Sequence, residues 1–226
     1  MPDSQQVVWR DEELSPIRDK VYQYIKQAIV QGVYKSGERI IERELADQLN
    51  VSRTPIREAL FRLESQGFVK TIPRKGVVVS KLSPEEIVEI FTILASLESL
   101  TMKLAAQKAE AAEREELTRL IGELDAVLAA PEIGEEHRMV HFVVHDVVCR
   151  AARSPRLTQM LDSLSDYIRA FANVGYELPG RLRKAIEEHR DLAKAVRDGE
   201  PDLAESLTKI HLENAKKAYL EALSKQ

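Results

Sequence analysis

Features that mark several other classes of protein are scarce in this sequence of 226 residues. A single cysteine, Cys149, permits neither an intramolecular disulfide nor a cysteine metal cluster, which fits a reducing compartment. Aromatic residues make up only 5%, and glycine and proline number nine each, which favours helices over a sheet-rich fold. No stretch approaches the ~18 apolar residues of a membrane helix, and the opening MPDSQQVVWRDEELS lacks the pattern of a signal peptide. We therefore expect a cytoplasmic, mainly α-helical protein without membrane contact.

The charge that is present is unevenly distributed. Apolar residues make up 44% and charged residues 31%, as in a soluble globular protein. Residues 1–81 carry 14 Lys+Arg and 11 Asp+Glu, a net charge of +3, whereas the remainder carries 19 and 26, a net charge of −7. This division predicts two domains, of which only the first faces a polyanion.

A short region of the basic half has the pattern of a helix-turn-helix. Two stretches with helical spacing flank the turn Asn50-Val51-Ser52, and Ser52 is the expected N-cap of the second helix. Two apolar runs then flank the basic turn Pro73-Arg74-Lys75-Gly76, which would form a wing. The expected helices cover about 42–49 and 53–66, and the expected strands cover 68–72 and 77–81.

The second of these helices has the chemistry of a DNA-reading helix. Arg53 and Arg57 are four residues apart, so they project from one face beside Thr54. A guanidinium can fork to a phosphate or to guanine O6 and N7, and the amides at a helix N-terminus favour phosphate. Residues 53–81 carry seven Lys+Arg against two Asp+Glu. A solvated basic face is the alternative, but the coincidence of turn, cap and wing favours DNA binding.

The run RELADQLNVSRTPIREALFRLESQGFV, followed by RKGVVV, resembles the winged helix-turn-helix of the GntR regulators. The resemblance covers about residues 15–82 and implies binding to operator DNA. Matched residue by residue, it implies DNA contacts at six positions: Arg43, Arg53, Thr54, Arg57, Gly76 and the adjacent Lys75.

The chain after Lys81-Leu82 reads as helix almost throughout. Ser83 and Glu86 form an expected capping box around Pro84, which marks the start of a second domain. Six helices of this length predict an antiparallel bundle. We expect a flexible N-terminus over 1–14, a winged domain over 15–82 and a bundle over 83–226, with helices over 84–109, 113–129, 135–153, 155–173, 179–199 and 201–223.

This second part resembles the FCD domain of the FadR branch of GntR regulators. The resemblance covers about residues 83–222 and depends on Leu97-Glu98, the segment SPRL, the run EEHRDLAKAVRDGEPDLA and the run IHLENA. Six helices place it nearer the VanR-like subgroup. The resemblance implies an effector-binding and dimerisation domain, and hence a transcriptional regulator, expected to be a repressor, whose small-molecule effector changes operator affinity.

Four histidines form a second pattern. His141 and His145 are four residues apart on an apolar helix, and His189 and His211 continue the apolar stripes of two later helices. Buried imidazoles need partners, so they are either separate hydrogen-bonded core residues or ligands of one divalent metal. We favour the shared metal. Four nitrogen ligands suit zinc, nickel or copper rather than manganese, and zinc or nickel is the expected cofactor.

The resemblance also implies two departures from the family pattern. Many FCD domains bind a divalent metal through one acidic residue and three histidines, and the acidic position falls here on His141. An arginine that often lies four residues before the Glu98 position, and is thought to hold an organic acid, is Leu94 in this chain. An organic acid is one candidate effector, but the sequence does not name the ligand.

Two functions follow from these patterns. A single winged domain makes few DNA contacts, so a regulator would be a homodimer on a near-palindromic operator, with half-sites about one helical turn apart. The alternative is a metalloenzyme with an accessory DNA-binding domain. Zinc hydrolases such as those with HExxH place an acid beside the metal, but HFVVH has no acid between its histidines and leaves Glu98 as the candidate base. The regulator is therefore the favoured function.

Overall fold

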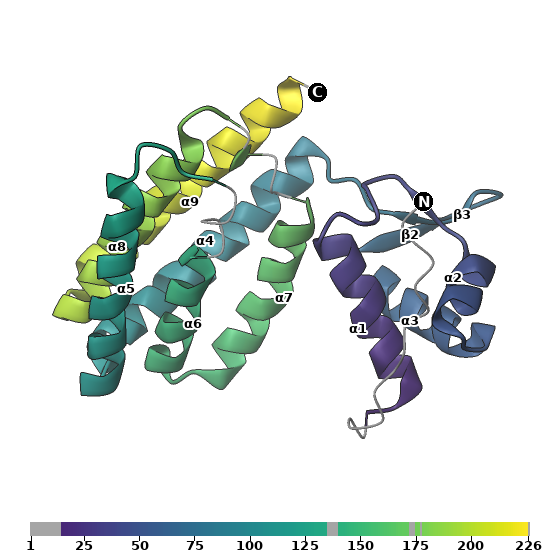
Figure 1. The fold of residues 1–226 in the computed structure, drawn as a ribbon, viewed down its shortest axis with the longest axis horizontal. Coiled ribbons are helices and arrows are strands. Elements are labelled where there is room, and N and C mark those ends of the chain that lie inside the picture. Colours follow the sequence, from purple (N-terminus) through teal and green to yellow (C-terminus); the bar gives the residue numbers. More distant parts are fainter. Residues whose placement is uncertain (1–14, 135–139, 172–174, 177, 226) are drawn as a thin grey trace. The chain divides into compact units, whose positions relative to one another are not determined.

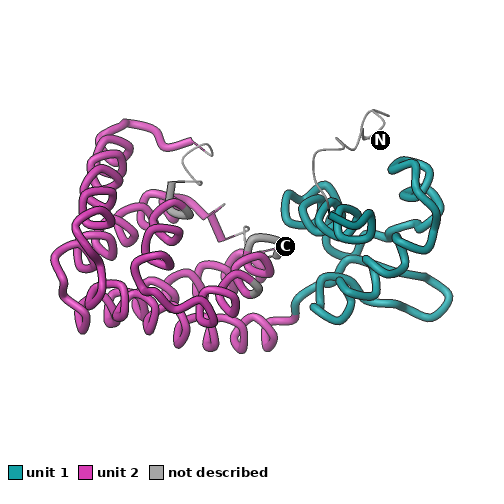
Figure 2. Tube along the Cα trace, turned by 90° about the horizontal axis from the view of Figure 1, so that it is seen from below, with its two compact units in different colours: residues 1–82, 169–171 teal, residues 83–168, 172–226 magenta. Residues whose placement is uncertain are grey.

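We describe the protein from a computed structural model. It covers residues 15–134, 140–171, 175–176 and 178–225, without the side chains of residues 140–142, 163 and 169–171. The chain separates into two compact units, one of residues 1–82 with 169–171 and one of residues 83–168 with 172–226 (Figure 2). The described residues are mainly α-helical, and a winged helix-turn-helix is followed by a bundle, which confirms the predicted fold class (Figure 1).

The first unit is built around three helices and a small sheet. Its core is apolar, and its fully buried side chains include Val21, Ile25, Leu49, Ile56 and Leu63. Helices α1 and α2 both pack against α3. The elements are α1 (Ile17–Val30), β1 (Arg39–Ile40), α2 (Glu42–Leu49), α3 (Arg53–Ser65), β2 (Val69–Ile72) and β3 (Gly76–Val79).

The turn between α2 and α3 is fixed by backbone geometry. Asn50 ends α2 in the left-handed conformation, with φ at 51°, which asparagine tolerates better than most residues. Ala46 is buried where the two helices approach. Ser52 occupies the N-cap position of α3 with an extended backbone, but its side chain makes no capping hydrogen bond. The predicted N-cap position is therefore correct, whereas the predicted side-chain cap is wrong.

The wing is a three-stranded antiparallel sheet in the order β1–β3–β2. Arg39 lies opposite Val78, and Ile72 lies opposite Gly76. The sequence predicts β2 and β3 but not β1, because a strand of two residues has no readable alternation. At the wing tip the amide of Lys75 donates to the carbonyl of Ile72 across 3.0 Å.

The second unit contains six described helices. Ser83 and Glu86 form the predicted capping box, with the Glu86 amide donating to Ser83 Oγ at 3.2 Å and the Ser83 amide donating to Glu86 Oε2 at 2.7 Å. The helices are α4 (Pro84–Lys108), α5 (Ala111–Ala129), α6 (Val140–Ala152), α7 (Pro155–Phe171), α8 (Arg181–Asp198) and α9 (Pro201–Ser224).

Helices α4 and α9 form the longest packed pair of the bundle, and they run antiparallel. Near the start of α4, the rings of Phe91 and Tyr219 lie 6.4 Å apart. Twelve residues later, Lys103 Nζ lies 2.8 Å from Glu205 Oε2, near the start of α9. These two contacts fix which residues of α4 and α9 lie at the same level.

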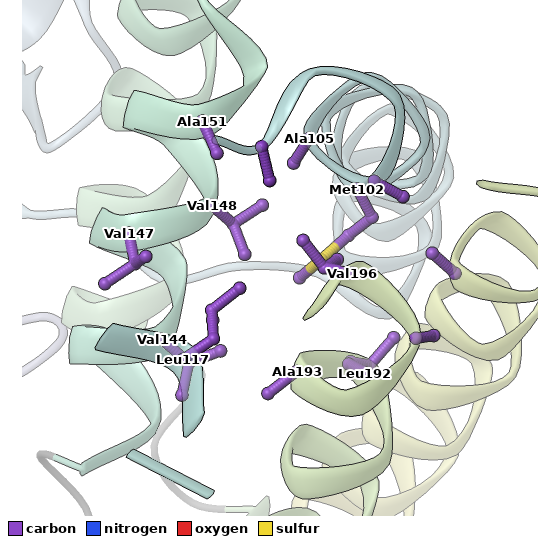
Figure 3. Close-up of a cluster of buried hydrophobic side chains, with 14 of the residues drawn as sticks. Met102, Ala105, Leu117, Val144, Val147, Val148, Ala151, Leu192, Ala193 and Val196 are labelled. Atoms are coloured by element: carbon purple, nitrogen blue, oxygen red, sulfur yellow. The ribbon is translucent and has the colours of Figure 1, made fainter. Parts of the chain in front are cut away.

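A tightly packed apolar cluster holds α4, α5, α6 and α8 together. Met102, Leu117, Val144, Val148 and Val196 are at most 1% exposed, and they meet between the helices (Figure 3). Burial of such side chains is the main favourable term in folding, which gives the bundle a rigid centre. In the described part of the chain, no helix is both long and apolar enough to cross a membrane.

Candidate functional site

The predicted DNA-contacting residues lie on the surface of the first unit. Arg53 and Thr54 are exposed in the first turn of α3, Arg57 is exposed one turn later, and Arg43 is exposed in the first turn of α2. Because the Ser52 side chain makes no capping bond, it does not occupy the amides at the start of α3. Such amides are the groups that bind phosphate at helix N-termini.

The wing presents its basic residues on a turn that needs unusual backbone angles. Pro73 and Arg74 occupy the two central positions, and Arg74 has a φ of 66°. Proline followed by a residue with positive φ is typical of a type II turn. Lys75 is exposed beside it, and Gly76 has a φ of 82°, a region that side chains rarely adopt. Gly76 is therefore required by the backbone geometry of the wing.

The exposed side chain of Arg57 forms an ion pair with Glu42. Its Nε donates to Glu42 Oε2 at 2.7 Å, and the two side chains are 65% and 32% exposed. Exposed ion pairs contribute at most about 1 kcal/mol, so this contact orients the guanidinium without holding it firmly.

In the second unit, three of the four predicted histidines come together. His145 on α6 and His189 on α8 place their Nε2 atoms 3.2 Å apart. His189 is 1% exposed, and its Nδ1 lies 2.7 Å from the carbonyl oxygen of Ala185. A carbonyl only accepts, so Nδ1–H of His189 donates to it. The Nε2 of a neutral His189 ring is then an acceptor, and His145 supplies the shared proton.

His211 on α9 joins this group through His189, with ring centroids 4.3 Å apart. Its Nδ1 lies 2.7 Å from Oε2 of Glu188, to which it donates. The same carboxylate accepts from Arg181 at 3.0 Å and from Asn214 Nδ2 at 2.8 Å. Burial alone would raise the pKa of Glu188, but hydrogen bonds and charge from His211, Arg181 and Asn214 outweigh it and lower the pKa.

The fourth predicted ligand lies outside this description. His141 belongs to α6, but its side chain is not among the described ones. Among the described side chains, no three histidine, cysteine, aspartate or glutamate groups converge in a way that could hold a metal ion. The described geometry therefore brings the Nε2 atoms of His145 and His189 within hydrogen-bond distance, and the His211 ring lies against the His189 ring.

Sequence reasoning missed the residues that fix these rings. Glu188 binds His211 and is itself held by Arg181 and Asn214, yet only the motifs that contain Glu188 and Asn214 were singled out. A usable signal existed for Asn214, because it lies three residues after His211 and shares its helix face. The contact of Glu188 with His211 joins two helices, and single-helix periodicity does not predict such contacts.

Two family models match the chain along these same regions. Residues 17–79 match the bacterial regulatory proteins of the gntR family, and residues 89–214, more than half of the chain, match the FCD domain. The chain belongs to the GntR family of transcriptional regulators. It carries the FCD domain as its second unit, as predicted.

Relatives of this GntR regulator are themselves regulators. The chain is 29% identical over 200 residues to the uncharacterized HTH-type transcriptional regulator YdhC of Bacillus subtilis, covering 87% of this chain and 88% of that protein. It is also 29% identical over 209 residues to the "Probable D-xylose utilization operon transcriptional repressor" of Paenarthrobacter nicotinovorans, covering 91% and 88%. The solved structure of E. coli McbR/YncC shares the fold, with a TM-score of 0.74, 24% identity and coverage of 92% and 99%. The two relatives are named as a transcriptional regulator and a transcriptional repressor, which favours the regulator over the metalloenzyme alternative.

The only cysteine of the GntR regulator lies on α6, one turn after His145. Cys149 lines a surface cavity of about 640 Å³ with Asp146, Arg153 and Asp162. Burial, reinforced by the negative charge of Asp162 and other nearby carboxylates, raises the pKa of the thiol to about 11. The thiolate is the form that binds metals and attacks electrophiles, so Cys149 is chemically quiet near neutral pH.

The ion pair around Glu188 leads to a stability prediction for this regulator. Arg181 and Glu188 have side chains only 9% and 10% exposed, so Glu188→Ala would leave a buried guanidinium without its carboxylate. We expect it to lower the free energy of unfolding by about 3–5 kcal/mol, measured by urea denaturation at fixed protein concentration.

The neighbouring Glu187 provides the matched control. Its side chain is 38% exposed and pairs with Lys184 at the surface, so Glu187→Ala should cost less than about 1 kcal/mol. Equal losses in the two variants would contradict a structural role for the Glu188 network.

Proposed function

We propose that this GntR regulator represses its target by binding a near-palindromic operator as a homodimer, and that its FCD domain binds a divalent metal and a small-molecule effector. The observation that carries the proposal is the buried histidine group, in which the outer nitrogens of His189 and His211 are already engaged by a carbonyl and a carboxylate. The relative that is named as a repressor supports the direction of regulation.

Operator contact is proposed for the exposed basic residues of the first unit. Arg53, Thr54 and Arg57 would enter the major groove, where Arg53 and Arg57 can read guanine edges. The first-turn amides of α3 would contact a phosphate, and the same role is proposed for Arg43 and for Lys75 with Gly76 at the wing. Glu42 would release Arg57 during docking, which costs little because the pair is exposed.

Replacing both Arg53 and Arg57 with alanine should abolish specific binding to an operator selected from random DNA. Each base-reading arginine is worth about 1–3 kcal/mol and confers specificity, which competition titrations against mismatched operators measure. Alanine at Arg43 or Lys75 should instead weaken all DNA alike and lower the salt slope by about one each.

Arg62→Ala is the control on the same helix. Its guanidinium lies 3.9 Å from the centre of the Tyr22 ring and pairs with Asp19 on α1, so the exposed side chain lies against α1 rather than beside Arg53 and Arg57. If the Arg53/Arg57 double variant bound the operator as tightly as Arg62→Ala, the proposed placement of α3 in the major groove would be refuted.

The metal proposal rests on ligand chemistry and ring orientation. Two nitrogens bound to one metal at ~2.0–2.1 Å lie about 3.0–3.5 Å apart, and the Nε2 atoms of His145 and His189 are 3.2 Å apart. Metal-binding histidines almost always donate their other N–H to a carbonyl or carboxylate, as His189 and His211 do here. The nitrogen spacing and these Nδ1 contacts support the proposal that His141, His145, His189 and His211 would hold the ion.

A divalent ion at this position would join α6, α8 and α9 and supply a Lewis acid for an effector oxygen. His189 and His211 would each present Nε2, because their Nδ1–H groups are engaged. His145 would give up the proton that it shares with His189. Zinc or nickel is the expected metal, because imidazole nitrogen suits both.

Purified protein offered zinc or nickel should bind one ion per chain, and both His145→Ala and His189→Ala should lose it. Elemental analysis after desalting measures the stoichiometry. Cys149→Ser should retain the ion, since the raised pKa keeps that thiol protonated. If wild-type protein folds and binds DNA but takes up neither metal, the metal proposal is wrong and the histidines are ordinary hydrogen-bonded core residues.

Homodimer formation is proposed to use the outer face of α4. Ile93 and Leu100 lie seven residues apart, on one side of the helix, and are 44% and 46% exposed. Helix α9, packed along α4, exposes Leu203 and Ile210 by 46% and 56%. Apolar side chains gathered in this way are typical of interaction surfaces.

Introducing a charge at this face should separate the subunits. Leu100→Asp is expected to yield a monomer at micromolar concentration in light scattering, with operator affinity lost, whereas Val33→Asp on the other unit should leave the dimer intact. A dimeric Leu100→Asp protein would move the interface elsewhere, and a monomeric wild type would end the proposal.

A further inference from the structure

Glu98 on α4 is a buried residue, and one of its carboxylate oxygens has no hydrogen-bond donor among the described residues. The residue is only 7% exposed. Its Oε2 atom is shielded from solvent and has no hydrogen-bond partner among the described residues. Buried acceptors in folded proteins nearly always have a partner, and an unmet acceptor costs about 1–3 kcal/mol. Glu98 therefore calls for a donor from outside these residues.

The contrast with Glu188 in the same bundle shows that this is not a general property of buried acids here. Glu188 accepts hydrogen bonds from Arg181, His211 and Asn214, and its side chain is 10% exposed. Two carboxylates of similar burial thus differ in one respect. Glu188 is surrounded by donors, whereas the Oε2 atom of Glu98 has none among the described residues.

The position of Glu98 along α4 places it in the layer of the histidines. Phe91 lies opposite Tyr219 and Lys103 lies opposite Glu205, so the antiparallel register puts Glu98 level with about residue 211 of α9, which is His211. One turn after Glu98, Met102 packs in the cluster that contains Val144, the neighbour of His145 (Figure 3). The carboxylate and the imidazoles therefore share one level of the bundle.

The neighbours of Glu98 on its own helix face leave no donor free. The hydroxyl of Thr101, three residues later, already donates to the carbonyl oxygen of Leu97 at 2.8 Å. Leu94, one turn earlier, is 3% exposed, and Met102, one turn later, is 1% exposed. Both are apolar. A ligand that enters this layer along α4 would meet two apolar side chains and one carboxylate oxygen that needs a hydrogen bond.

We propose that Glu98 selects the effector of this regulator, which binds through a hydroxyl or ammonium group that donates to Glu98 Oε2. This inference rests on the proposed effector function of the FCD domain and narrows its ligand class. A compound that presents only carboxylates would bring negative charge toward a carboxylate, and repulsion excludes it from this position. The effector is therefore an amine or a polyol rather than a simple organic acid.

The first test needs no knowledge of the effector. Glu98→Met removes the unmet acceptor and keeps a side chain of similar length, so the Tm of the empty protein should stay the same or rise. Glu188→Met removes a fully partnered carboxylate and should lower the Tm. A Glu98→Met protein that is destabilised as strongly as Glu188→Met would show that Glu98 already has a structural partner, and would overturn the proposal.

The second test uses three probes with one four-carbon skeleton: 1,4-diaminobutane, 1,4-butanediol and succinate. The diamine or the diol should raise the Tm of wild-type protein at up to tens of millimolar, and succinate should not. Calorimetric titration of Glu98→Gln with the active probe should show a Kd weaker by about tenfold or more, since the amide oxygen that replaces the carboxylate is an uncharged and weaker acceptor.

The remaining outcomes also decide the question. Stabilisation by succinate alone, stabilisation by none of the three probes, or equal Kd values for wild type and Glu98→Gln would each overturn the inference. Operator binding is measured on the same wild-type sample, so that a failure of the Glu98 inference can be told from a failure of the proposed function. Retained DNA binding with no probe response would reject the role of Glu98 only, whereas loss of specific DNA binding would reject the regulator proposal itself.

Discussion

Imidazole rings buried between helices impose the strictest requirement in this molecule. A ring nitrogen that reaches the bundle interior must donate or accept there, because a buried polar group without a partner costs free energy. His189 meets this requirement through its own helix at Ala185 and through His145 on α6, and His211 meets it through Glu188 on α8. Each of these contacts also fixes the rotation of a helix about its axis. The positions of α6, α8 and α9 are therefore coupled through side chains and not through apolar packing alone.

Much of the fold could be predicted from periodicity and from turn residues. The helix starts at Arg53 and Pro84 were predicted at the observed residues, because a turn or a capping box stands directly before each. The start of α5 at Ala111 was missed by two residues, since Glu110 acts there as an N-cap, and glutamate is not a usual signal for that position. Strand β1 was missed because its two residues are defined only by their partners on β3.

The candidate site was less predictable, because its decisive contacts join residues far apart in the chain. Helical spacing correctly indicated that His189 and His211 are buried. It gave no account of Glu188, which looks like one more charge in an acidic run until α9 brings His211 against it. Glu98 was noticed in a motif, but its missing partner is a property of its surroundings. Pairings of this kind depend on helix register, which a sequence taken alone does not contain.

The contact between Arg57 and Glu42 has a consequence for how the protein searches along DNA. Glu42 holds the guanidinium much as a phosphate would, so the carboxylate competes with every backbone phosphate that the proposed reading surface meets. At a non-specific site, Arg57 would exchange Glu42 for a phosphate and gain little. At a site with a matching base, it would also gain a hydrogen bond to the base edge. The Glu42 carboxylate beside α3 thus weakens binding to random sequence more than binding to the operator, and so favours dissociation from non-specific DNA.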